Sequence, residues 1–118
     1  RMQEVMAAFR AGPPNSIGRD RVLQVRDYER QCVIRFDDAG QPSDPQPLSG
    51  PKGDLVFLDL ATDGNYVACR PSGTEPKIKF YMFAYKSPEQ LSNLEAAKAE
   101  LEERLSRMEA DVREFAGV

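Results

Sequence analysis

The 118-residue sequence contains no histidine and only two cysteines, and each shortage excludes a class of site. Histidine is the most common general base and metal ligand in proteins, so a site built on imidazole is excluded. Two cysteines, Cys32 and Cys69, cannot form the disulfide framework that holds many small secreted domains together. Both lie in apolar, strand-like stretches, and we therefore expect them to be buried free thiols.

The sequence also lacks a long apolar run and an excess of positive charge. No apolar stretch approaches the roughly 18 residues of a membrane-spanning helix, and no signal peptide opens the chain. We therefore expect a cytoplasmic protein with no membrane partner. The 16 basic and 19 acidic residues give a net charge of −3, which argues against nucleic acid as a partner. A chain of this length is expected to form one domain, over 1–118, with one modest core.

The most informative segment is Arg-Pro-Ser-Gly-Thr-Glu-Pro-Lys at positions 70–77, followed by Ile78 and Lys79. Proline, serine, glycine and threonine alone usually indicate a plain surface turn. Here an arginine and two lysines stand beside them, and backbone amides in a tight turn next to such cations form a nest that binds phosphate. Positions 70–86 hold four cations and one acid in an otherwise acidic chain, which suits a single small anion.

Five residues of this segment are assigned to a phosphate site, and none is assigned to catalysis. Arg70 offers a planar fork to two phosphate oxygens, which lysine could not mimic. Ser72 and Thr74 are expected to donate hydroxyl hydrogen bonds, and Gly73 to let the backbone approach the anion. Lys79 is expected to reach back to the phosphate from the following strand. Glu75 would repel phosphate, so it is assigned to loop geometry or to a neighbouring cation.

The hydrophobic pattern predicts an α+β fold with a mostly antiparallel four-stranded sheet and helices packed on one face. Apolar spacing predicts a helix near positions 2–9, and strands are expected near 22–28, 55–60, 66–70 and 78–85. In the last strand, alternation places Ile78, Phe80 and Met82 on one face and Lys77, Lys79 and Tyr81 on the other. Positions 32–36 either pair with the first strand or form an irregular extension. Positions 37–53 hold four prolines and indicate a long exposed loop.

The last third of the sequence predicts a long helix. Ser87 with Gln90 is a capping-box pattern, and Pro88 suits the first helical position. A near-heptad apolar stripe follows, made of Leu91, Leu94, Leu101, Leu105, Met108, Val112 and Phe115. A coiled coil and one amphipathic helix lying on the sheet are both compatible with this stripe. The second is favoured because an open sheet face already requires cover.

The residues Arg-Pro-Ser-Gly-Thr-Glu-Pro-Lys-Ile-Lys-Phe-Tyr at 70–81 resemble the phosphate-binding loop of the α-D-phosphohexomutase family, the phosphoglucomutases and phosphomannomutases. Weaker likenesses are Phe9-Arg10, Pro13-Pro14 and positions 25–28. The resemblance is to the C-terminal, fourth domain of these enzymes, which grips the phosphate that is not reacting. It implies a two-layer fold like that of the TATA-box-binding protein. The family often has arginine at the position matching Lys79.

The same resemblance implies an enzyme that moves a phosphoryl group between C1 and C6 of a hexose through a phosphoserine and a bisphosphate intermediate. Such enzymes use Mg²⁺, but neither the serine segment nor the metal motif of the family occurs here, so no cofactor is expected in this fragment and it should not be catalytic alone. Its implied partners are a phosphosugar and upstream domains of the same chain. Because the sequence begins inside a helical pattern at Arg1, we expect it to be part of a longer chain.

Two other functions are compatible with the sequence. The chain could be a stand-alone phosphosugar-binding module, or its long helix could make it an oligomerisation domain. The sequence does not select among glucose, mannose, glucosamine and pentose phosphates, since each presents the same phosphate to the loop.

Overall fold

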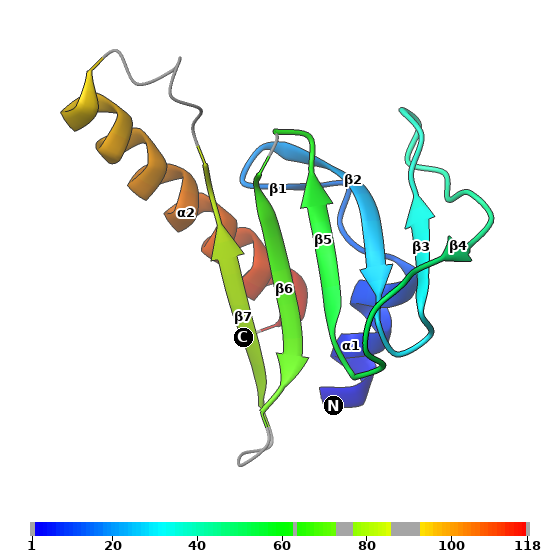
Figure 1. The fold of residues 1–118 in the computed structure, drawn as a ribbon. Coiled ribbons are helices and arrows are strands. Elements are labelled where there is room, and N and C mark those ends of the chain that lie inside the picture. The colour runs from blue at the N-terminus through cyan, green and yellow to red at the C-terminus, as the bar shows by residue number, and fades with distance from the viewer. Residues whose placement is uncertain (1, 63, 73–76, 86–92, 118) are drawn as a thin grey trace.

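Two helices and a seven-stranded sheet make up the described part of the chain (Figure 1). The computed structural model describes residues 2–62, 64–72, 77–85 and 93–117. The helices are α1 (Met2–Ala11) and α2 (Leu94–Ala116). The strands are β1 (Ser16–Ile17), β2 (Asp20–Asp27), β3 (Cys32–Arg35), β4 (Gln46–Pro47), β5 (Val56–Leu60), β6 (Tyr66–Pro71) and β7 (Ile78–Phe83). The sheet is open, with the order β4-β3-β2-β5-β6-β7, and β1 pairs with β2. The predicted α+β class is therefore confirmed.

The predicted number of four strands is wrong. The four expected strands are present as β2, β5, β6 and β7, and every described strand pair is antiparallel. β3 pairs with β2, which decides the alternative left open for positions 32–36. The two further strands, β1 and β4, have two residues each, too few to show an alternating pattern. β4 even contains Pro47, which an edge strand tolerates because its outer side needs no donor.

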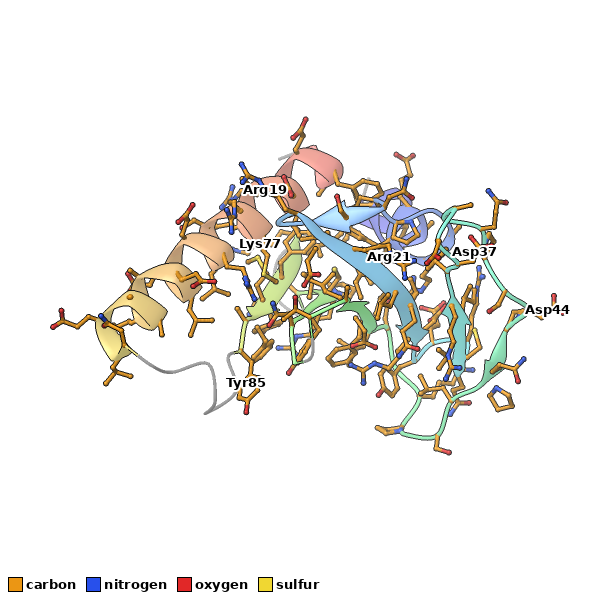
Figure 2. All side chains as sticks on the ribbon, turned by 90° about the horizontal axis from the view of Figure 1, so that it is seen from above. Arg19, Arg21, Asp37, Asp44, Lys77 and Tyr85 are labelled. Atoms are coloured by element: carbon orange, nitrogen blue, oxygen red, sulfur yellow. The ribbon has the colours of Figure 1, made fainter. Side chains whose placement is uncertain are left out.

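Both helices cover the same face of the sheet, as predicted. Figure 2, which looks along the strands, shows α1 and α2 on one side and Tyr85 on the other. The buried core joins side chains of both helices with alternate residues of β5 and β6. Val22 and Val25 of β2 both face this core although they are three residues apart. The strand has a bulge between Val22 and Gln24, which turns both valines to the same side.

An aromatic contact fixes α1 against both the sheet and α2. Phe9 has no exposed surface, and its ring centroid lies 5.7 Å from that of Phe80 in β7 and 4.8 Å from that of Phe115 in α2. The tilted ring arrangements are those that aromatic pairs prefer. Phe9 therefore joins three elements that are far apart in the sequence.

The next residue, Arg10, holds α1 through a buried ion cluster. Its Nε donates to Oδ1 of Asp27 at 3.3 Å, its Nη2 lies 3.1 Å from Oε2 of Glu29, and it also donates to Asp54. Arg10 is 7% exposed and Asp27 is 3% exposed. Burial alone lowers the pKa of Arg10, but its hydrogen bond to Asp54 and the surrounding carboxylate charges outweigh burial and raise that pKa. The cluster ties α1 to the end of β2 and to the segment before β5.

The long helix α2 begins later than the sequence pattern predicts. Its N-cap is Asn93, whose side chain accepts a hydrogen bond from the Ala96 amide at 3.1 Å. The predicted capping residues Ser87, Pro88 and Gln90 lie outside the described residues. Leu94 was expected on the packed stripe but is 72% exposed. The stripe does reach the core further along, where Met108 and Val112 are buried.

The two cysteines are free, but only one of them is buried. Burial raises the pKa of Cys69 to about 12, whereas Cys32 is half-buried in β3, near the edge of the sheet. The prediction of two buried thiols is therefore right for Cys69 and wrong for Cys32. In the described part of the chain, no helix is long and apolar enough to cross a membrane.

Gly18, in the turn between β1 and β2, is pressed against α2. Its φ is +60°, its N–H donates to Oδ2 of Asp111 at 2.7 Å, and a Cβ at this position would lie 2.6 Å from Cγ of Met108. We expect Gly18→Ala to lower the free energy of unfolding by about 2–4 kcal/mol, through the positive φ and overpacking together. Urea denaturation measures this change. Gly53→Ala is the control, since a Cβ there meets nothing within 4 Å. Equal effects of the two substitutions would contradict the expected role of the α2 contact.

Candidate functional site

The predicted phosphate segment connects the last two strands of the sheet. β6 and β7 pair from Tyr66↔Phe83 to Pro71↔Ile78, and the Ser72 amide donates to the Lys77 carbonyl at 2.8 Å just beyond the last pair. The chain therefore closes on itself between positions 72 and 77. This geometry confirms the two predicted strands on either side of the segment, whereas positions 73–76 between them lie outside the described residues.

Two cations, Arg70 and Lys79, lie directly opposite each other in this hairpin. Both side chains are exposed on the face away from the helices, because the alternate residue Cys69 belongs to the core. Like charges directly opposite each other repel and destabilise a strand pair. Within the described residues, neither cation forms an ion pair with a carboxylate. A bound anion is the group that would remove this repulsion.

The rest of this open face carries a row of aromatic rings that crosses the sheet. The successive ring centroids are 5.6, 5.5 and 4.4 Å apart, and the row consists of Tyr28, Phe57, Tyr66 and Phe83. Arg26 lies over Phe57 at 4.4 Å and donates to both carboxylate oxygens of Asp59, at 2.7 and 2.9 Å. Its charge is thus neutralised within the face, whereas Arg70, on the same face, has no carboxylate partner among the described residues.

The structure brings together part of the predicted site. Arg70 and Lys79 are adjacent, and Ser72 follows directly at the end of β6, where it is half-buried. Gly73 and Thr74 lie outside the described residues, as does Glu75, so the predicted roles of these three stay predictions. The expected alternation of β7 is confirmed, because Ile78, Phe80 and Met82 pack against the core.

Comparison with known proteins finds similarity to proteins named phosphoglucomutase. The chain is 32% identical over 82 residues to a protein named phosphoglucomutase from Staphylococcus aureus strain MSSA476. It is 30% identical over 82 residues to a protein of the same name from strain N315. This chain is distantly related to the phosphoglucomutases. Each alignment covers 70% of this chain and 14% of the relative, so the chain matches about one seventh of a phosphoglucomutase.

The aligned stretch takes in the hairpin that carries the phosphoglucomutase-like segment. A single stretch covering 82 of 118 residues must include positions 37–82, and therefore Arg70, Ser72 and Lys79. No family model matches the sequence, and no solved structure matches it. The likeness to the TATA-box-binding-protein fold consequently remains a prediction from the phosphohexomutase resemblance.

Sequence reasoning placed Tyr81 on the same face as Lys79 but gave it no function. In the structure, the Arg70 guanidinium donates to the Tyr81 hydroxyl at 3.1 Å. The two residues are not directly opposite, since Tyr81 pairs with Ala68 and Arg70 with Lys79. Only the strand register shows that they are diagonal neighbours, so alternation alone could not have identified this contact.

A separate groove of about 600 Å³ runs along β7 beside the helices. It touches Lys77, Lys79 and Tyr81, but its other lining residues are mostly apolar and include Met2, Val5, Phe80 and Val112. Arg70 and Ser72 do not line it. An apolar wall does not suit phosphate, so this groove is a poor candidate for the predicted phosphate site. Within the described residues, no group of acidic, cysteine or histidine side chains could hold a metal ion.

Proposed function

We propose that this chain is the C-terminal phosphate-binding domain of a larger, four-domain phosphohexomutase. Its relation to a segment of the phosphoglucomutases supports this proposal, and one structural observation carries it. Arg70 and Lys79 face each other on an exposed strand pair without a carboxylate partner among the described residues. Such a pair is favourable when it shares an anion, and the phosphate of a sugar phosphate is the anion that a phosphoglucomutase relative would supply.

In this proposal, each residue of the site contributes a different kind of donor or charge to the phosphate. Arg70 gives two parallel N–H donors to two phosphate oxygens, and Lys79 adds a point charge from the opposite strand. Ser72 supplies a hydroxyl at the start of the loop. Gly73 and Thr74 complete the site with backbone and hydroxyl donors in this proposal. The site binds the phosphate that does not react and thereby positions the opposite end of the sugar.

In the proposed complete enzyme, the phosphoryl group moves between C1 and C6 of a hexose by way of a phosphoserine and a bisphosphate intermediate. The serine and the Mg²⁺ ion belong to other domains, because this chain has neither the serine segment nor the metal motif of the family. Since the phosphate grip must hold first one terminal phosphate and then the other, it should bind phosphate only moderately tightly. The isolated domain is therefore a binder without catalytic activity.

Titration with inorganic phosphate tests the site directly. We expect a dissociation constant in the millimolar range, because one anion contact without sugar contacts supplies about 3–5 kcal/mol. In a two-dimensional NMR spectrum, the amide signals of Ser72, Gly73 and Thr74 should shift together with those of Arg70 and Lys79. Sodium chloride at equal ionic strength should not reproduce these shifts.

Two variants distinguish phosphate binding at a specific site from general attraction of phosphate to positive charge. Arg70→Ala should remove the response to phosphate, whereas Lys98→Ala, on the exposed surface of α2, should leave it unchanged. Shifts scattered over the chain, or no shift at high phosphate, would show that positions 70–79 are not a phosphate site.

A further inference from the structure

Tyr81 lies beside the two cations of the hairpin but outside the aromatic row. It is directly opposite Ala68. The next pair on the same face of the hairpin is Arg70 and Lys79. The small Ala68 side chain leaves space above β6 for the phenol ring to lean toward Arg70. In the described residues, Tyr81 forms no ring pair with the row of Tyr28, Phe57, Tyr66 and Phe83. Packing within that row therefore does not explain where this ring lies.

Two side-chain contacts join Tyr81 to the arginine of the proposed site. Nη2 of Arg70 donates to the phenol oxygen at 3.1 Å, and Cζ of Arg70 lies 5.5 Å from the centroid of the ring. The second distance is within the range of a cation–π contact. An exposed arginine side chain normally samples many rotamers, and losing that freedom opposes binding. Two contacts to one tyrosine restrict the guanidinium before any ligand arrives.

The direction of the hydrogen bond leaves the tyrosine with a donor of its own. A guanidinium has no acceptor, so the phenol oxygen must accept from Arg70, and the phenol hydrogen points elsewhere. Within the described residues, this hydroxyl donates no hydrogen bond. Tyr81 is 39% exposed, and it lies on the same face of the hairpin as Lys79. The arginine fork, the lysine and the phenol hydroxyl therefore offer donors from neighbouring positions on one face of the hairpin.

We propose that Tyr81 is a further ligand of this anion site, which both positions Arg70 and donates its hydroxyl hydrogen to the anion. This inference rests on the proposed phosphate-binding function. These three side chains, one of them a bidentate arginine, offer more donors than the two oxygens of a carboxylate suit, whereas a phosphate monoester presents three terminal oxygens. The chemical class of ligand is therefore a phosphate monoester, with Tyr81 contributing to its selection.

The test is phosphate titration of a double-mutant cycle, with inorganic phosphate as the probe. Tyr81→Phe keeps the ring and removes only the hydroxyl, and we expect it to raise the phosphate dissociation constant about threefold to tenfold. In an Arg70→Lys background the same change should have a clearly smaller effect, because the guanidinium that Tyr81 positions is gone. Tyr85→Phe is the control, since Tyr85 lies on the side of the sheet away from the helices (Figure 2) and, among the described residues, Arg70 donates to Tyr81 and not to Tyr85.

The outcomes separate this inference from the function on which it rests. If Tyr81→Phe binds phosphate as tightly as the unchanged chain while Arg70→Ala does not bind, the inference is wrong and the phosphate site stands. An effect of equal size in both Arg70 backgrounds also overturns it. If the unchanged chain does not bind phosphate at all, both fail. The amide spectrum of each variant shows whether the fold is retained, which we expect because the substitution removes one oxygen from a partly exposed side chain.

Discussion

We expect the replacement of Arg70 by lysine in the proposed complete phosphohexomutase to lower kcat/KM by about tenfold to a hundredfold, the effect of losing one charged hydrogen bond. Lysine keeps the positive charge but cannot donate two parallel bonds from a planar group. Lysine also lacks the guanidinium group that donates a hydrogen bond to Tyr81. Both parameters change, with KM rising and kcat falling, because binding of the distant phosphate helps to align the reacting end.

Steady-state kinetics with a hexose monophosphate measure this effect. Arg35→Lys is a matched control. Arg35 is also an exposed strand arginine, but it lies in β3, toward the edge of the sheet opposite β7. We expect its kinetics to stay close to those of the unchanged enzyme. Unaltered kinetics in the Arg70 variant would remove Arg70 as the anchor. A similar loss in the Arg35 variant would indicate a general effect of charge or stability.

Arg10→Met is expected to reduce the free energy of unfolding by about 3–5 kcal/mol, as happens when one partner of a buried ion pair is removed. Methionine keeps much of the aliphatic volume and removes the charge. The substitution leaves Asp27, which is 3% exposed, without its buried cation, and it leaves Asp54 and Glu29 close to the same position. Since folding stability is only about 5–15 kcal/mol for most domains, this change is large.

Chemical denaturation of the two variants Arg10→Met and Arg26→Met provides the comparison. Arg26 also binds a carboxylate through two bonds, but its side chain is 27% exposed and that of Asp59 is 23% exposed. A partly exposed pair contributes about 1 kcal/mol or less, so Arg26→Met should cost much less. Equal losses in the two variants would show that burial of the Arg10 cluster is not what makes it important.

The hairpin that carries the site could be predicted because its signals are local. Apolar alternation on both sides of a turn rich in proline, serine and glycine gives two strands joined by a short loop, and β6 and β7 form as expected. Alternation also assigns Lys79 and Tyr81 to the open face. It cannot show which residues stand opposite one another across the hairpin. The Arg70 contact with Tyr81 depends on that register and became visible only in the structure.

The start of α2 and the burial of Arg10 could not be predicted, because the first depends on two competing N-cap residues and the second on partners that are distant in the sequence. Ser87 and Asn93 are both good N-cap residues, and a pattern cannot decide between them, whereas in the structure Asn93 caps α2. An arginine on an amphipathic helix is expected at the surface, yet Arg10 is buried. Its partners Asp27 and Asp54 lie 17 and 44 residues further along the chain, so no local pattern reveals them.

The proposed site lies at the edge of the sheet, and ligand binding there would be coupled to local opening of the edge strand. β7 is the last strand of the sheet and has hydrogen bonds to one neighbouring strand, β6. Detachment of β7 would separate Lys79 and Tyr81 from Arg70 while β2, β5 and β6 remain paired, a sub-global opening that requires less than complete unfolding. A ligand that needs all three residues binds only the closed form. At ten times its dissociation constant it would stabilise that form by about 1.4 kcal/mol, so bound phosphate would keep the edge strand β7 paired with β6.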